Sequence, residues 1–154
     1  MVDDIPSGHV FLSYVREDAD RVNRLQRALV GAGLPVWRDT DSLSPGQDWK
    51  LEIGNAINRD ACAFIACFSE HSAARDKSYQ NEELAQASEQ MRLRRPGKPW
   101  LIPVRFAAVT LPYFSLGAGR ALSDLHGVDL IGDDWDSGVA TLVRATRMIL
   151  DAQR

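Results

Sequence analysis

The fold is decided by residues 61–87, ACAFIACFSEHSAARDKSYQNEELAQA. An unbroken apolar run, ACAFIACF, ends here in a polar loop that leads into a long amphipathic segment. A strand that is apolar on both faces is typical of the centre of a parallel sheet, where helices cover each side. Open sheets of this kind bind their ligands beyond the carboxyl ends of the strands. We therefore expect residues 69–78 to border the functional site.

A strand–helix–strand unit precedes this stretch. Residues 9–14, HVFLSY, and residues 34–37, LPVW, predict two strands. Residues 17–32 lie between them and carry apolar side chains at helical spacing. Glu17 and Asp18 stand at the start of this helix, where the helix dipole favours acidic residues. Connections this short imply that the two strands are parallel and joined by a right-handed crossover.

A long polar loop follows the second strand. Residues 38–48, RDTDSLSPGQD, exceed the roughly 2–6 residues of most strand-to-helix connections. Long loops at this end of a sheet commonly carry function. Trp49 and Ile57 lie in a second predicted helix, for which Asp48 is a candidate N-cap.

The second half of the chain continues the alternation. A third helix is predicted to start between residues 76 and 78 and to end before Pro96. Its inward face is predicted to hold Leu84, Ala85, Ala87, Ser88 and Met91. Residues 100–106, WLIPVRF, predict a fourth strand, in which Pro103 must occupy an unpaired position because proline has no N–H to donate.

The last part of the chain is less regular. Residues 107–127 show no clear period, and we expect an irregular connection with one helical turn. Residues 128–131, VDLI, predict a short final strand. A final amphipathic helix follows, capped by Asp136 or Ser137.

Together these elements predict an α/β fold of the flavodoxin-like type, a three-layer sandwich. Its five-stranded parallel sheet has the order 2-1-3-4-5 and helices on both faces. The ligand crevice of that arrangement lies between strands 1 and 3. We expect residues 1–7 to be an N-terminal tail and residues 8–152 to be a single domain.

Composition narrows the classes of partner. The 154 residues carry a net charge of −3, with a sequence pI of about 5.6. Such a chain has no bulk electrostatic attraction for nucleic acid or for an anionic membrane, so we expect neither as a partner.

Cys62 and Cys67 lie at an odd separation in one strand and therefore on opposite faces, which prevents a disulfide between them. Buried reduced thiols, and a start without an apolar signal segment, predict a cytoplasmic protein.

Several chemistries are disfavoured by missing motifs. The chain has no G-x-G-x-x-G after the first strand and no G-x-x-x-x-G-K-[ST]. The ends of strands 1 and 3 lack the acidic residues of a phosphate-accepting receiver domain. His9, His71 and His126 show no metal-ligand spacing, so no metal site is expected.

Tyr79 and Glu83 are the most informative polar pair. They are four residues apart and so share one face of the third helix, whereas Glu82 points away from that face. An aromatic ring next to a carboxylate suits a flat cationic ring bonded to a sugar, because the carboxylate can stabilise positive charge that develops on the sugar. The alternative is that Glu83 is a solvated helix side chain.

The sequence resembles a TIR domain of the bacterial kind from about Gly8 to Asp151. The resemblance rests on five blocks in the family's order: HVFLSYVREDAD, AGLPVWRDTDSLSPGQDW, ACAFIACFSEHS, SYQNEELAQA and WLIPVRF. The fourth and fifth blocks are similar to those of TIR modules fused to STING-type or other cyclic-nucleotide sensors in anti-phage defence.

The resemblance implies an activity, cleavage of NAD+ between nicotinamide and ribose to give ADP-ribose or a cyclic form. The family's catalytic glutamate corresponds to Glu83, and its nicotinamide-side aromatic, often Trp, corresponds to Tyr79. Gln80 stands where a Cys is common. NAD+ is then a substrate, and no cofactor is implied. The resemblance also assigns substrate-binding positions to Ser13, Tyr14, Arg16, Arg38, Asp39 and Trp49.

The resemblance further implies regulation by self-association, extending to filaments, with low activity in an isolated monomer. The candidate assembly loop comprises Asp41, Ser42, Leu43, Ser44, Pro45 and Gly46. A fused or associated cyclic-nucleotide sensor is an implied partner. Two other functions stay open: a non-catalytic TIR adaptor or scaffold, and a nucleoside-processing enzyme of flavodoxin-like shape.

Overall fold

The computed structural model describes residues 9–37, 57, 61–75, 79–93, 99–117 and 119–152, without the side chains of Ala61, Cys62 and Tyr79. Five parallel strands form the main sheet in the order β2-β1-β3-β4-β7. The predicted order 2-1-3-4-5 is confirmed, since β7 is the fifth strand predicted from sequence. The strands are β1 (His9–Ser13), β2 (Val36–Trp37), β3 (Ala61–Phe68), β4 (Leu101–Arg105) and β7 (Val128–Asp129).

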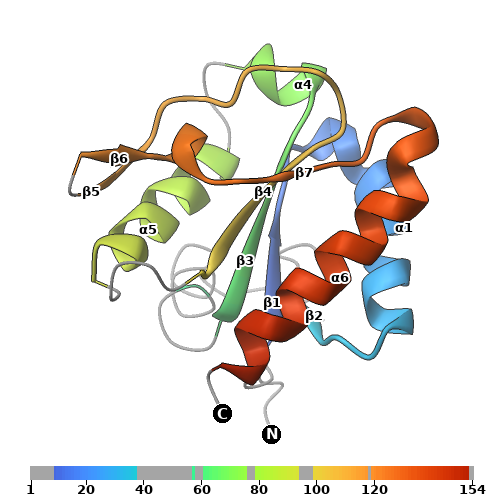
Figure 1. Cartoon of the computed structure of the whole chain (residues 1–154). Coiled ribbons are helices and arrows are strands. Elements are labelled where there is room, and N and C mark those ends of the chain that lie inside the picture. Colours follow the sequence, from blue (N-terminus) through green and yellow to red (C-terminus); the bar gives the residue numbers. More distant parts are fainter. Residues whose placement is uncertain are drawn as a thin grey trace, which may run out of the picture.

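Helices cover both faces of the sheet (Figure 1). α1 (Ala19–Gly31) and α6 (Trp135–Asp151) lie on one face, and α5 (Tyr79–Leu93) lies on the other. Short 3-10 turns join the elements at η1 (Arg16–Asp18), η3 (Leu122–Asp124) and η4 (Gly132–Asp134). The three-layer arrangement predicted from the alternating pattern is therefore the one observed.

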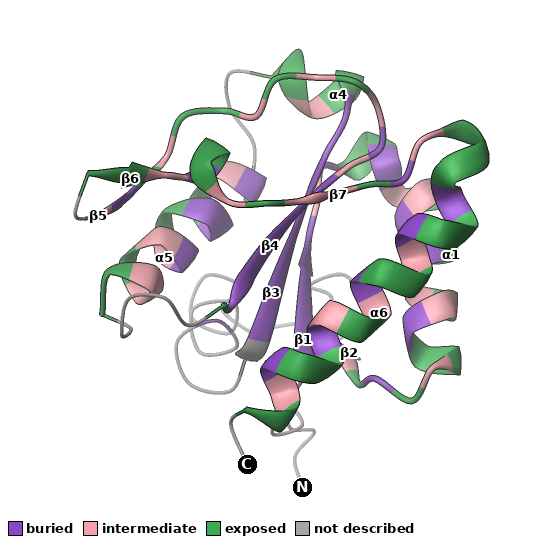
Figure 2. Ribbon diagram, in the orientation of Figure 1, coloured by how far each residue is buried: buried purple, intermediate pink, exposed green. Residues whose placement is uncertain are grey.

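The core divides into two apolar clusters, one on each face of the sheet (Figure 2). Alternation along β3 directs Ile65 and Cys67 toward α1 and α6, and Phe64 toward α5. Cys67 is buried and forms no disulfide, as expected for this residue. On the α5 side, Phe64 contacts Trp100 with ring centroids 5.7 Å apart. Ile57, in the second predicted helix, is fully buried in this second cluster; the rest of that helix lies outside the described residues.

Pro103 occupies a position in β4 where no N–H is needed. Pairing of β4 with β7 begins at Val104 and Val128, one residue after the proline. The chain entering β7 also passes very close to Pro103, because a Cβ at Gly127 would lie 2.5 Å from the Pro103 carbonyl oxygen. Only glycine fits at 127 without displacing the backbone of β4.

Three local features differ from the sequence prediction. A short helix, α4 (Glu70–Ala73), lies within the expected polar loop. A two-stranded antiparallel sheet, β5 (Ser115–Gly117) with β6 (Arg120–Ala121), lies in the connection expected to be irregular, beside the expected helical turn η3. Ala85 is exposed rather than inward-facing, since the buried face of α5 consists of residues three and four apart that do not include it.

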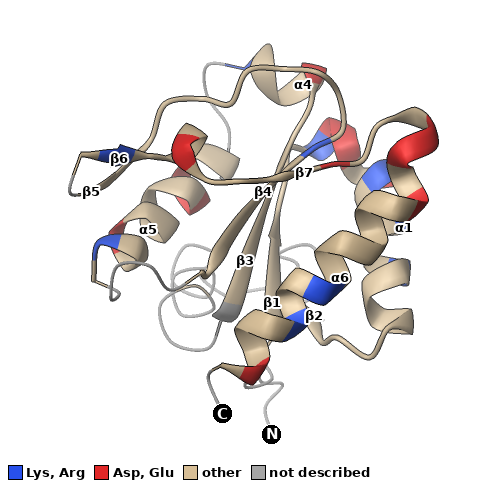
Figure 3. Cartoon of the chain, viewed as in Figure 1, with Lys and Arg blue, Asp and Glu red and all other residues tan. Residues whose placement is uncertain are grey.

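The final helix begins two or three residues earlier than a cap at Asp136 or Ser137 predicts. α6 starts at Trp135 with Asp134 in the N-cap position, so Asp136 and Ser137 lie inside the helix. Acidic residues gather at the start of α6 (Figure 3), where the helix dipole favours them. Trp135 is buried and stacks on Phe106, which draws the start of the helix onto the sheet.

Candidate functional site

Glu83 lies where β1 ends. The Ser13 hydroxyl, on the last residue of β1, donates a hydrogen bond of 2.7 Å to Glu83 Oε1. Ser13 points toward α5 because it alternates with Leu12, which faces the α1 and α6 side. The carboxylate predicted from helix spacing therefore meets the strand end predicted from the fold.

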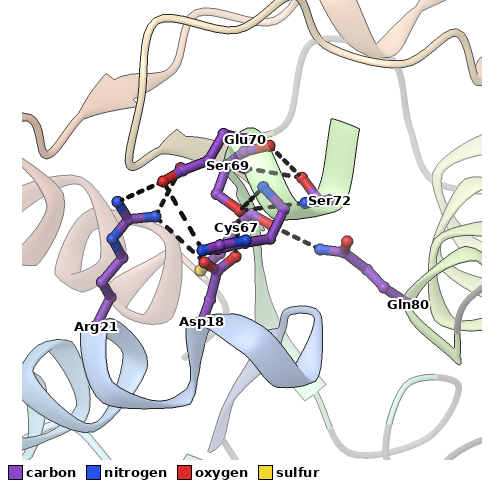
Figure 4. Close-up of polar contacts among 8 residues, drawn as sticks. Asp18, Arg21, Cys67, Ser69, Glu70, Ser72 and Gln80 are labelled. Carbon is purple, nitrogen blue, oxygen red and sulfur yellow. Dashed lines mark hydrogen bonds and ion pairs between the residues drawn. The ribbon is translucent and has the colours of Figure 1, made fainter. Parts of the chain in front are cut away.

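Gln80 holds the same helix against both central strands. Its Nε2 donates to the Cys67 carbonyl oxygen at 2.6 Å and to the Ser13 carbonyl oxygen at 3.1 Å (Figure 4 shows Cys67 and Gln80). Gln80 is 2% exposed and lies one turn before Glu83. Ser13 is consequently bound twice by α5, at its carbonyl by Gln80 and at its hydroxyl by Glu83.

The Glu83 carboxylate is enclosed in this conformation. Glu83 is 2% exposed and Ser13 is fully buried. Two surface depressions lie elsewhere, one between α1 and α6 and the other beside β7 and the start of α6. A substrate can reach Glu83 only in a conformation that exposes the carboxylate more than this one does.

A second polar cluster lies at the end of β3 (Figure 4). The Ser69 hydroxyl accepts hydrogen bonds from the backbone N–H groups of His71 and Ser72 at 3.0 and 3.2 Å, which caps α4. The same hydroxyl donates to Asp18 Oδ2 at 2.5 Å. Because Asp18 closes η1, this bond ties the connection after β1 to the connection after β3.

Ion pairs extend this cluster to the surface. Arg21, in α1, forms a two-pronged contact with Glu70 at 2.9 and 3.0 Å and also reaches Asp18 at 3.2 Å. Arg75 pairs with Glu17 at 2.9 Å. The hydrogen bonds from Arg21 lower the pKa of Glu70 to about 2, helped by a backbone hydrogen bond at Glu70. Exposed pairs of this kind contribute little individually but act here as a network.

The low pKa of Glu70 predicts a pH dependence of stability. A carboxyl group whose pKa falls from 4.5 to about 2 on folding stabilises the fold above pH 4.5, and this contribution is lost as the pH falls toward 2. We expect Glu70→Gln to lower the melting temperature at pH 7, with a difference from wild type that narrows between pH 5 and pH 2. Thermal unfolding across this range measures it. The control is Asp133→Asn, which removes one negative charge at an exposed carboxylate in η4. A difference in melting temperature between Glu70→Gln and wild type that stays constant from pH 5 to pH 2 would contradict the assignment.

The other predicted site residues do not all lie near Glu83, and some lie outside the described residues. Tyr14 is partly buried against the apolar cluster on the α1 and α6 side, the face opposite Glu83. Arg16 is exposed in η1 and His71 is exposed in α4, and Glu82 is exposed, as expected. The side chain of Tyr79 and several further predicted positions lie outside the described residues. These positions are Arg38, Asp39, Asp41, Ser42, Leu43, Ser44, Pro45, Gly46 and Trp49.

Three residues of the site were not predicted from sequence. From sequence, Gln80 is only a departure from a family pattern, Asp18 is explained by the helix dipole, and Ser69 lies in an expected polar loop. A serine directly after a buried strand, followed by a second serine three residues on, was the available signal for the α4 cap. Nothing local indicates the bonds that Asp18 and Gln80 make, because their partners are distant in sequence.

The described residues limit the chemistry further. Within the described ranges, no three His, Cys, Asp or Glu side chains gather in a way that could hold a metal ion. None of the helices in the described part of the chain combines the length and hydrophobicity needed to cross a bilayer. What the site offers is a carboxylate, a hydroxyl and an amide at the crevice between β1 and β3.

The sheet order and the polar groups at the β1–β3 crevice define a flavodoxin-like α/β protein with its candidate site at the topological switch point. Within that class the chain belongs to the TIR domain family, whose model matches residues 10–143. A search of curated proteins gave no match.

Solved structures give the same fold. The chain is similar to the TIR domain of the Toll-related receptor TRR-2 from Hydra magnipapillata, with 20% identity, a TM-score of 0.68, and coverage of 90% of this chain and 97% of the receptor domain. It is similar to a metazoan TIR-STING receptor from C. gigas, solved with 2′,3′-cGAMP, at 19% identity and a TM-score of 0.68, covering 94% of this chain and 41% of that one. The TIR domains of the activated Roq1 resistosome match at 27% identity and a TM-score of 0.53, covering 64% of this chain and 57% of that one.

Proposed function

We propose that this TIR domain is an NAD+ glycohydrolase. It cleaves the bond between nicotinamide and ribose and releases nicotinamide. The ribose carbon then bonds to the oxygen of a water molecule, which loses a proton, to give linear ADP-ribose, or to a nitrogen of the adenine to give the cyclic form. The observation that carries the proposal is the position of Glu83, which α5 brings to the end of β1 within 2.7 Å of the Ser13 hydroxyl. The site is the crevice where sheets of this order bind ligands.

The residues present suit this reaction. Nicotinamide leaves as a neutral molecule from a cationic pyridinium, so no proton has to be supplied to the leaving group. The ribose gains positive charge as the bond breaks, and an ionised carboxylate next to it lowers the energy of that state. Glu83 has this role in the proposal, and Ser13 orients its carboxylate. Tyr79 stacks the nicotinamide ring one turn earlier.

We further propose that self-association activates the domain. Because Glu83 is only 2% exposed, a conformation that admits NAD+ is a minor one in the isolated chain. Copies that bind each other more tightly in the open conformation than in the enclosed one raise the population of the open conformation. The increase is set by the difference between the two affinities. In this proposal the domain is a TIR module that acts as a clustered effector, in the cytoplasm, coupled to a cyclic-nucleotide sensor in bacterial anti-phage defence.

The test is release of nicotinamide from NAD+ by the wild-type chain, free and clustered on a multivalent scaffold. Chromatography separates nicotinamide, ADP-ribose and cyclic ADP-ribose in one run. We expect slow release by the free chain and an increase of at least about tenfold on clustering. Intact NAD+ under both conditions would contradict the proposal.

A non-catalytic adaptor is the alternative, and the enclosure of Glu83 is the observation that favours it. An adaptor would assemble on the same scaffold and recruit further copies while leaving NAD+ unchanged. Light scattering recorded during the same incubation separates the two functions, because it reports assembly whether or not nicotinamide appears.

A further inference from the structure

We infer that Gln80 is a positioning residue that sets the location of the Glu83 carboxylate, an inference that rests on the proposed function. Pairing between β1 and β3 ends at Ser13 and Ala66. The next donor at this edge comes from α5, where the Gln80 side chain binds the Ser13 and Cys67 carbonyl oxygens. Gln80 thus bridges the two strands where their own hydrogen bonding stops.

The chemistry of the amide makes this contact specific. Both partners are carbonyl oxygens, which only accept hydrogen bonds, so the NH2 group must face them and each of its hydrogens has one partner. Gln80 is 2% exposed, so water has little access to replace it. A buried carbonyl oxygen that loses its donor is left unpaired at a cost in free energy, and this cost holds α5 at this height on the strands.

The link from Gln80 to Glu83 is geometric. The two side chains are three residues apart and lie on one face of α5. They bind the same residue, Ser13, at its carbonyl and at its hydroxyl. A shift or rotation of α5 that breaks the first contact also moves the carboxylate away from the end of β1. Leu84 and Ala87 pack the following turn of α5 into the apolar core, and Gln80 supplies the polar contacts at the start of the helix.

The experiment compares Gln80→Met with Gln90→Met. Methionine has nearly the length of glutamine but donates nothing, and Gln90 lies in the same helix away from the strand ends and is half-buried. In clustered protein we expect Gln80→Met to lower kcat for NAD+ cleavage by about 10- to 100-fold, with little change in KM, because a misplaced group loses mainly transition-state stabilisation. Gln90→Met should leave kcat unchanged.

The double variant tests whether Gln80 acts through Glu83. In a Glu83→Gln background, Gln80→Met should cause no further loss of the residual rate, since the group it positions is already absent. Multiplied effects of the two substitutions would show that Gln80 acts independently and would overturn the inference.

A second readout does not depend on activity. The carboxyl 13C resonance of Glu83, assigned by its loss in Glu83→Gln, reports its hydrogen bond to Ser13. We expect this resonance to shift in Gln80→Met and to stay in place in Gln90→Met. If the wild-type chain leaves NAD+ intact but the resonance still shifts in Gln80→Met, the positioning role is retained and the proposed function is rejected. A resonance that does not move in Gln80→Met rejects the positioning role alone. If Gln80→Met does not fold, Gln80→Ala, which leaves room for water at the two carbonyls, is measured with the same two outcomes.

Discussion

Glu83→Gln is expected to reduce NAD+ cleavage by clustered protein by at least about 100-fold while leaving the fold intact. Glutamine keeps the shape of the side chain and an oxygen that can accept the 2.7 Å hydrogen bond from Ser13. It removes only the negative charge that the proposal assigns to stabilising the ribose cation. Losing one well-placed electrostatic group in an active site typically costs about 10²–10³ in kcat. Nicotinamide release at saturating NAD+ measures the effect.

Glu82→Gln is the matched control. Glu82 is the adjacent residue in α5, and its side chain is exposed. Its substitution by glutamine changes the net charge by the same amount. We expect its rate to equal that of wild type and its melting temperature to be similar. Equal rates for Glu83→Gln and Glu82→Gln, in variants with equal melting temperatures, would remove Glu83 from the mechanism.

Asp18→Ala is expected to destabilise the fold by about 2–4 kcal/mol. The Asp18 side chain is fully buried and accepts a 2.5 Å hydrogen bond from Ser69 and a 3.2 Å contact from Arg21. Removing one member of a buried polar pair typically costs about 3–5 kcal/mol, because the remaining partner loses its compensation. The expected cost lies around the lower end of that range because Arg21 keeps its contact with Glu70 and is 37% exposed. Urea denaturation gives the free energy of unfolding.

Two further variants separate the causes of this loss. Asp20→Ala changes the same residue type in the first turn of α1, where the side chain is exposed, and should cost less than about 0.5 kcal/mol. Asp18→Asn keeps an oxygen for the Ser69 hydroxyl and loses only the charge next to Arg21, so its cost should be intermediate. If Asp18→Ala costs no more than Asp20→Ala, the bond between the two loop connections does not hold the fold.

The sheet was predictable from sequence because its signals are local. Residues 61–68 are apolar on both faces, which only a central strand requires, and helical spacing before and after them sets the alternation of elements. The alternation leaves few topologies once right-handed crossovers are required. Even Pro103 was informative, since the position it demands is the one it occupies before pairing with β7 begins.

The site was only partly predictable, because its bonds join residues far apart in the chain. Glu83 could be chosen from its place on the helix, but its contact with Ser13 depends on how α5 sits on the strands, and no local pattern specifies that. Asp18 was interpreted through the helix dipole, which explains an acidic residue there without requiring burial. Ser69, its buried partner, is 51 residues away. The short helix α4 was missed because its cap ends in Ser72 rather than the usual Glu or Gln.

The most direct test is a structure of the clustered domain bound to an NAD+ analogue that cannot be cleaved. The measured quantity is the distance from the Glu83 carboxylate oxygens to the hydroxyls of the nicotinamide-bearing ribose. Our account predicts about 2.5–2.7 Å, the length of a hydrogen bond from a hydroxyl to a carboxylate, with Glu83 more exposed than the 2% seen here. An analogue bound elsewhere, with Glu83 still enclosed against Ser13, would contradict it.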